Sequence, residues 1–361
     1  FRRVLFRSRI LAINPGSTST KIAVYDGEEQ ILVKTIDHPA EEIAKYNTIQ
    51  DQFEMRKEAV LNILKENSID LKSLSAIVGR GGVLPPVKSG AYLVNEEMID
   101  VLRHRPVLEH ASNLGAVVAH AISEPLGINS YIYDSVAVDE LIDVARISGL
   151  CGMDRSSAGH ALNTRAMALK YAKDKGKDYK SLNLIVAHIG GGVSIYLHEK
   201  GRMVDMLSDD EGPFSPERSG RVPATKLVAA CYSGQYSERE MTKKIRGKGG
   251  IVSYLNTVDA REVEKMIAEG NEEAKIIYEA MAYQLAKGIG ELATVVDGKV
   301  DAIIITGGIA YSEMFTSMVK KKVEFIAPVE IMAGENELES LAFGTLRVLN
   351  GEEEARIYSE N

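Results

Sequence analysis

Short apolar runs alternate with helical patterns along the chain. Continuous apolar runs bounded by turn residues predict buried strands at 10–14, 183–189, 301–306 and, as the final strand, 329–332. Apolar residues spaced three or four positions apart predict helices, most clearly over 52–67 and 337–349. Strands interleaved with helices in this way predict an α/β fold.

A three-strand pattern occurs twice, over residues 10–36 and 183–207. In each copy a buried strand runs into a glycine-containing turn, and two further short strands follow, which predicts an antiparallel meander. When the copies are aligned, Gly16 falls on Gly190 and Gly27 on Gly201 without a gap. This agreement favours an internal duplication over chance similarity between two meanders.

The repeat predicts two related domains, each a mixed sheet with a β-meander and flanking helices. We place the first domain at 9–154, completed by a C-terminal helix at 338–361, and the second at 155–337. No linker or low-complexity segment separates them, so the boundary rests on topology alone. Ligands in such folds bind where the loops after the strands converge, which predicts a nucleotide and a substrate in the cleft between the domains.

Composition excludes several classes of protein. A net charge of −8 and a pI near 5.6 argue against a general nucleic-acid or membrane-surface binder, and no apolar run approaches a membrane span. Two cysteines, Cys151 and Cys231, provide neither a disulfide framework nor a zinc site, which fits a reducing cytosol. The basic segment 1–9 lacks the pattern of a secretory signal, and we interpret it as an extension upstream of the fold.

Three glycine turns that follow predicted strands have the character of phosphate sites. The first combines glycine, hydroxyls and a lysine, although it is not a Walker A loop. The second has three consecutive glycines, which let an anion approach the backbone, and the third lies between a strand and a helix. Together they point to a bound nucleotide, through turns at 14–21, 188–194 and 306–310.

The first two turns resemble signatures of the acetate and butyrate kinase family, in the segments ILAINPGSTSTK and AHIGGGVSI. The resemblance runs from Arg9 to the C-terminus and implies the fold of actin, hexokinase and Hsp70. Gly191, where acetate kinases usually have asparagine, and the segment His160-Ala-Leu-Asn163 resemble the butyrate kinase branch. Gly159 departs from that branch, which has an aromatic residue there, and we expect the glycine to open space near the site.

The resemblance also implies residue roles. It implies four active-site residues, of which the first lies beside the acyl group and the third beside the transferred phosphoryl group: Arg80, Asp134, His160 and Arg218. For the nucleotide it implies Asn14, Ser17, Ser19, Lys21, Gly190, Gly191, Gly192, Asp259, Arg261, Gly307 and Gly308. For magnesium it implies Asn14 and Glu337.

Some of these residues also have purely structural interpretations. Asp259 is equally suited to be the N-cap of a helix over 260–269. Glu337 can complement the dipole of the last helix, and His188, at a strand end, is expected to be structural or to support the site. Arg80 and Arg218 lie in glycine- or proline-rich loops, which suits an anion site better than a surface charge.

The implied activity is an ATP- and Mg²⁺-dependent carboxylate kinase, most simply butyrate + ATP = butyryl phosphate + ADP, by direct in-line transfer. A carboxylate is already ionised, so the reaction needs charge stabilisation rather than a general base. The alternatives are an acetate, propionate or branched-chain acid kinase, and a non-catalytic ATP-binding regulatory or assembly protein of the same fold. A cytoplasmic homodimer or larger homo-oligomer, without nucleic-acid or membrane partners, is the corresponding family expectation.

Overall fold

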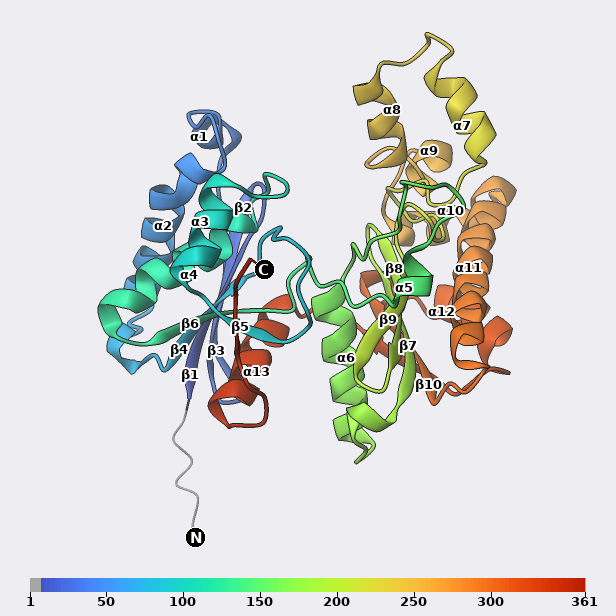
Figure 1. The fold of residues 1–361 in the computed structure, drawn as a ribbon. Coiled ribbons are helices and arrows are strands. Elements are labelled where there is room, and N and C mark those ends of the chain that lie inside the picture. The colour runs from blue at the N-terminus through green and yellow to red at the C-terminus, as the bar shows by residue number, and fades with distance from the viewer. Residues whose placement is uncertain (1–7, 361) are drawn as a thin grey trace. The chain divides into compact units, whose positions relative to one another are not determined.

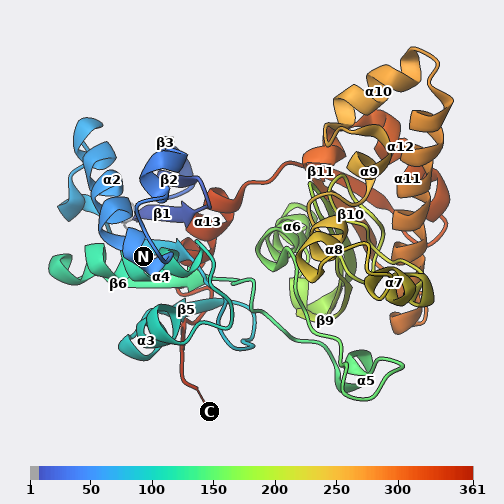
Figure 2. The same cartoon turned by 90° about the horizontal axis from the view of Figure 1, so that it is seen from above.

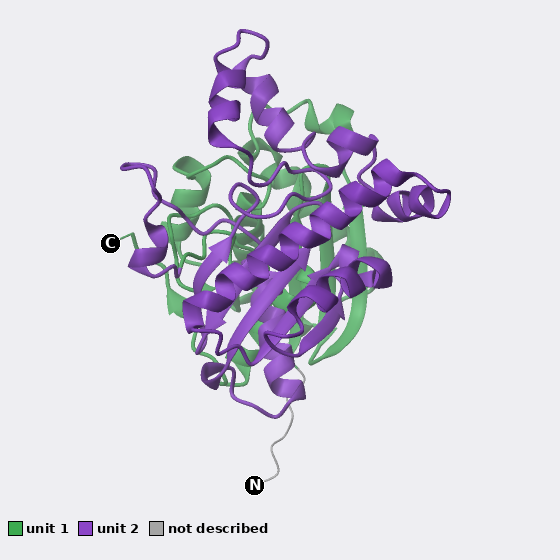
Figure 3. Cartoon of the chain, turned by 90° about the vertical axis from the view of Figure 1, so that its right-hand side faces the viewer, with its two compact units in different colours: residues 1–139, 336–361 green, residues 140–335 purple. Residues whose placement is uncertain are grey.

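The computed structural model describes residues 8–360, which form two compact units (Figure 3). Unit 1 contains the chain up to Asp139 and again from Asn336, and unit 2 is Glu140–Glu335. Unit 2 therefore begins before residue 154, where we placed the domain boundary. The reason is that residues after Asp139 bond to strand β9 (Arg202–Leu207), for example through Ile142 N–H to the Val204 carbonyl, 3.0 Å. Of the basic segment 1–9, residues 1–7 lie outside the described residues.

Unit 1 is built on a seven-stranded mixed sheet of order β12-β5-β6-β4-β1-β2-β3 (Figure 1). The meander β1-β2-β3 is antiparallel, and β4 and β6 continue the sheet parallel to β1. The strands are β1 (Arg9–Pro15), β2 (Ser19–Asp26), β3 (Glu29–Asp37), β4 (Ala76–Arg80), β5 (Ala91–Leu93), β6 (Asn129–Tyr133) and β12 (Arg356–Ile357).

Helices cover both faces of this sheet because its central strands are apolar on both sides. Leu11, Ile13 and Ile77 pack against α2 and α4 on one face. On the other face α13 packs with its Phe343 edge-on to Tyr25, 5.6 Å between ring centroids. The helices are α1 (Ala40–Ile43), α2 (Phe53–Glu66), α3 (Glu96–His104), α4 (Asn113–Ser123) and α13 (Glu337–Leu349).

Unit 2 repeats the plan with a five-stranded sheet of order β11-β10-β7-β8-β9. The meander β7-β8-β9 is antiparallel, and β10 and β11 run parallel to β7. The remaining strands are β7 (Asn183–Ile189), β8 (Val193–Glu199), β10 (Ala302–Gly307) and β11 (Val329–Ala333).

Alternate residues of β7 and β10 face opposite layers of helix. Ile185 and Ile303 belong to the core under α11 and α12, whereas Val186 and Ile304 pack toward α6. Figure 2 shows α11 and α12 on one side of this sheet and α6 on the other. The helices are α5 (Asp143–Arg146), α6 (Ala161–Asp174), α7 (Ala224–Cys231), α8 (Glu238–Ile245), α9 (Ile251–Leu255), α10 (Ala260–Ala268), α11 (Glu272–Ala293) and α12 (Glu313–Val323). No helix in the described part of the chain is long and apolar enough to cross a membrane.

The predicted α/β fold with two meander-containing sheets is confirmed, with two corrections. First, β12 follows β11, which the sequence indicated as the last strand. Second, the copies do not align without a gap. Pro15 pairs with Thr20 in the first hairpin, whereas Ile189 pairs with Val193 in the second, so the second turn is one residue shorter.

Candidate active site

Polar residues predicted from the sequence gather at the carboxyl ends of the central strands of unit 1. Asn14, near the end of β1, donates from Nδ2 to Glu337 Oε2 at 2.6 Å. Arg80, which ends β4, donates from Nη1 to the carbonyl of Asp134 at 3.3 Å, and its Nη2 lies 3.8 Å from Glu337 Oε1. We call these four residues cluster 1: Asn14, Arg80, Asp134 and Glu337.

Asp134 follows β6 in a backbone conformation that is unfavourable for a non-glycine residue, with φ +40°. Its side chain is buried, and Oδ1 accepts the N–H of Gly90 at 2.7 Å, while its own N–H donates back to the Gly90 carbonyl. The reciprocal bonds hold the aspartate in this conformation. Strain of this kind is typical of functional positions.

The first glycine turn is supported by a buried arginine that the sequence analysis did not select. Arg56 of α2 is fully buried and donates to the carbonyls of Ser17 and Ser19, at 3.3 and 3.1 Å. Lys21 lies on β2 opposite Asn14 and is exposed. A signal for Arg56 was available, because it lies one helical turn before Val60 on the apolar face of the helix.

His110 is a second residue of unit 1 that was missed. Its Nδ1 lies 2.8 Å from Ser112 Oγ, and burial together with the positive charge of Arg80 lowers the pKa of the imidazole. A neutral ring beside Arg80 leaves that arginine available for an anion. No glycine turn or helical periodicity marks His110 in the sequence.

In unit 2 the second glycine turn, the predicted histidine and the second predicted arginine come together. A Cβ on Gly192 would lie 3.7 Å from His160 Cε1 and 3.9 Å from Arg218 Cζ, so both side chains face this turn. The hydroxyl of Ser215 donates to the Gly191 carbonyl at 2.7 Å and clamps the turn from the loop that carries Arg218. We call this set cluster 2: His160, Gly190, Gly191, Gly192 and Arg218.

Two nitrogens of the Arg218 guanidinium differ in their hydrogen bonding. Its Nη1 donates to Asp209, whereas its Nε is buried and has no hydrogen-bond partner among residues 8–360.

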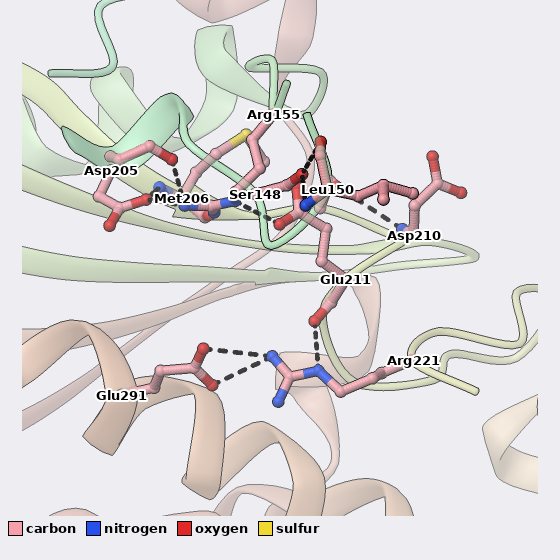
Figure 4. A network of polar contacts seen from close by, with 11 residues as sticks. Ser148, Leu150, Arg155, Asp205, Met206, Asp210, Glu211, Arg221 and Glu291 are labelled. Atoms are coloured by element: carbon pink, nitrogen blue, oxygen red, sulfur yellow. Dashed lines mark hydrogen bonds and ion pairs between the residues drawn. The ribbon is translucent and has the colours of Figure 1, made fainter. Parts of the chain in front are cut away.

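Ion pairs and hydrogen bonds of Glu211 and Arg221 hold the loop that carries Arg218; Figure 4 shows these contacts. Arg155 binds Glu211 and lies 3.1 Å from Asp205, and Arg221 donates to the Glu211 carbonyl at 2.8 Å and to the carboxylate of Glu291. These contacts limit the positions that the Arg218 guanidinium can take.

The third glycine turn follows β10. Gly307 has φ +93°, and a Cβ there would lie 2.4 Å from the Ile189 carbonyl, so only glycine fits against the end of β7. Space is open beside Gly308. Hydrogen bonding from His188 is the largest cause that lowers the pKa of Glu335.

Asp259 and Arg261 lie at the start of α10 and pair with each other. Asp259 Oδ1 accepts the backbone N–H of Arg261 at 2.9 Å, so the helix-cap interpretation is confirmed. The guanidinium of Arg261 lowers the pKa of Asp259 to about 2. Contact of this pair with a nucleotide stays a prediction.

Gly159 does not open space, which corrects the expectation from the sequence. A Cβ at this position would lie 2.6 Å from Ser194 Oγ and 2.9 Å from Tyr196 Oη. The hydroxyl of Tyr196, from β8, therefore occupies the room that an aromatic side chain at position 159 would need.

The metal prediction is compatible with the donor atoms present. Within the described residues, no three His, Cys, Asp or Glu side chains group to hold a metal by themselves. Cluster 1 offers the Glu337 carboxylate and the Asn14 amide oxygen. Mg²⁺ usually takes one or two such oxygens and completes its shell with waters and substrate phosphates.

The two mixed sheets with meanders and glycine turns define a protein of the actin-like ATPase fold. Among solved structures, the acetate kinase of Porphyromonas gingivalis has a TM-score of 0.75 at 21% identity, covering 95% of this chain and all of that one. A propionate kinase from Francisella tularensis subsp. tularensis has a TM-score of 0.73 at 19% identity, covering 93% and 98%.

Sequence comparison is more specific. The acetokinase family matches residues 158–352. Butyrate kinase 2 and butyrate kinase 1 of Clostridium acetobutylicum are 51% and 53% identical over 352 residues, 97% of this chain and 99% of each relative. The chain belongs to the acetokinase family.

Proposed function

We propose that this protein phosphorylates butyrate with ATP and yields butyryl phosphate and ADP. Near full-length identity above 50% to two proteins named butyrate kinase supports this substrate. The observation that carries the phosphoryl-transfer chemistry is that the Arg218 guanidinium and the His160 ring both face the three-glycine turn.

In the proposed reaction a carboxylate oxygen attacks the γ-phosphorus of ATP in line with the departing ADP oxygen. Arg80 would hold the carboxylate, and Asp134 would keep that arginine in place through its carbonyl. The Gly190–Gly192 amides, His160 and Arg218 would bind the equatorial oxygens, on which negative charge is concentrated. Asn14 and Glu337 would hold Mg²⁺, which neutralises phosphate charge when bound.

The nucleotide would also contact the first turn, through Ser17, Ser19 and Lys21, and the third turn, through Gly307 and Gly308. We further propose that the protein is cytoplasmic and forms a homo-oligomer. Sedimentation of the purified protein tests the oligomeric state. Acetate, propionate or branched-chain acids are the alternative substrates.

The decisive test is to trap the acyl phosphate with hydroxylamine in the presence of Mg-ATP and butyrate. Hydroxamate formation that depends on both substrates supports the proposal. ATP binding without hydroxamate from any short-chain acid would instead favour the non-catalytic alternative.

We expect kcat/KM for butyrate to exceed that for acetate by about tenfold or somewhat more. Two additional buried methylenes are worth about 1.6 kcal/mol, and a modest preference of this size leaves acetate as a weak substrate. The measurement compares acetate, propionate, butyrate, isobutyrate and isovalerate at fixed Mg-ATP. Equal or higher values for acetate would contradict the butyrate assignment and leave the carboxylate kinase proposal intact.

Two variants of Asp259 separate its cap role from its proposed nucleotide role. Asp259→Ala is expected to lower Tm and to raise the Kd for ATP about tenfold, the loss of one charge-assisted contact. Asp259→Asn retains a good N-cap, so Tm should stay near that of the wild type while the Kd still rises. Wild-type ATP binding by Asp259→Asn, measured by calorimetry, would leave only the cap role.

A further inference from the structure

Glu335 occupies a junction between the ends of three strands of unit 2. It follows β11 and Gly334, which exchanges backbone hydrogen bonds with Gly307 at the end of β10, at 3.1 and 3.2 Å. Its Oε1 lies 3.1 Å from Nε2 of His188, near the end of β7. A Cβ on Gly190 would lie 2.4 Å from the same oxygen, so glycine at 190 is what admits the carboxylate.

His188 is held from both sides of its ring. It is 2% exposed, and its Nδ1 lies 2.8 Å from Oδ1 of Asn163, on α6. Asn163 donates from Nδ2 toward the Gly334 carbonyl at 3.5 Å, which turns its oxygen to the histidine. Both ring nitrogens therefore face oxygen atoms of neighbouring side chains, Nδ1 that of Asn163 and Nε2 that of Glu335.

The His188 ring in turn supports His160. The two imidazoles stack with centroids 3.9 Å apart and planes 14° from parallel. Ser194 Oγ lies 2.9 Å from Nδ1 of His160 and fixes its rotation. The position of His160 therefore depends on a ring that is itself oriented by Asn163 and Glu335.

We propose that Glu335 is a positioning residue of the phosphoryl-transfer site, which orients His188 through Nε2 and thereby holds His160 against the three-glycine turn. This inference rests on the proposed function for the role of His160, and on geometry alone for the contact. Displacing a catalytic group by a fraction of an ångström to 1 Å lowers turnover by up to 10²-fold, whereas groups that bind the substrates keep their contacts.

Glu335→Gln tests the kinetic part, because it removes the charge and keeps the shape. We expect kcat to fall roughly 10- to 100-fold, with KM for butyrate and for Mg-ATP within twofold of the wild type. Glu324→Gln, an exposed glutamate after α12 in the same unit, is the matched control and should behave as wild type. A kcat within twofold of wild type, or a raised KM for ATP at unchanged kcat, overturns the proposal.

The ring nitrogens of His188 test the contact itself without any substrate. In histidine-labelled wild-type protein the Nδ1 and Nε2 signals of His188 are assigned by their disappearance in His188→Asn. Glu335→Gln should shift or remove the Nε2 signal and keep the Nδ1 signal, and an unchanged pair overturns the contact. Glu335→Asp, whose carboxylate is one methylene shorter, should give the same spectral and kinetic losses and serves if Glu335→Gln does not fold. Wild-type protein that forms no acyl phosphate would contradict the proposed function, while the spectra still decide the contact.

Discussion

Arg218→Ala is expected to lower kcat by about 10²- to 10³-fold, while the Kd for ATP changes much less. The guanidinium faces the three-glycine turn, so in the proposed reaction its bond to a phosphoryl oxygen is strongest when charge accumulates in the transition state. Removing one such stabiliser typically has an effect of this size.

The measurement pairs steady-state kinetics with ATP titration of the same purified variant. Arg239→Ala removes an exposed arginine of α8 in the same unit and should leave both constants unchanged. Arg218→Lys keeps the charge without the planar fork and should fall between wild type and Arg218→Ala. Turnover near the wild-type rate in folded Arg218→Ala would remove this residue from the site.

Gly115→Ala is expected to destabilise the protein by about 3 kcal/mol or more. Gly115 of α4 lies directly against β4, and a Cβ on it would come 2.2 Å from the Arg80 carbonyl and 2.8 Å from the Arg80 N. Both obstacles are backbone, so no side chain can rotate away, and the helix must move off the strand that ends in Arg80.

Gly290→Ala provides a control of opposite sign. Gly290 lies inside α11, and nothing is within 4 Å of a Cβ built on it. Alanine there should stabilise the protein by roughly 0.5–1 kcal/mol through helix propensity. Denaturant unfolding followed by circular dichroism measures both variants, and wild-type stability of Gly115→Ala would show that α4 does not depend on this close approach.

Local patterns predicted the parts of the fold that local physics determines. The meanders have continuous apolar strands and glycine turns, and the last helix was predicted as Glu337–Leu349, its observed bounds. The three-residue strand β5 was missed because it is too short to show alternation. Helix α3 was also missed, although the cap Asn95 before the apolar Met98 and Leu102 marks its start in the sequence.

The register of the repeat could not be read from glycine positions. In the second turn of each meander, Gly27 has φ +63° in the first copy, whereas Lys200 and Gly201 have +47° and +89° in the second. Either central position of a tight turn of this type accepts a positive φ. Glycines can therefore align in sequence without determining which residues pair across the strands.

The residues of the candidate site also fall into a group that the sequence predicted and a group that it did not. Glycine turns and family motifs pointed to Arg80, Asp134, His160 and Arg218, and the structure places these in cluster 1 and cluster 2. The supporting residues Arg56 and Glu335 were missed because their contacts join segments far apart in sequence, which no local window records.

The division of the chain also affects how the protein is made. Unit 2 is one continuous segment, so all of it has been synthesised when Glu335 is added. Unit 1 is interrupted, and Gly344 of α13, whose missing Cβ lets the ring of Tyr133 approach to about 2.5 Å from the Cβ position, is synthesised only after the whole of unit 2. Unit 1 is therefore begun before unit 2 and completed after it, and one apolar face of its sheet stays uncovered while unit 2 can already fold.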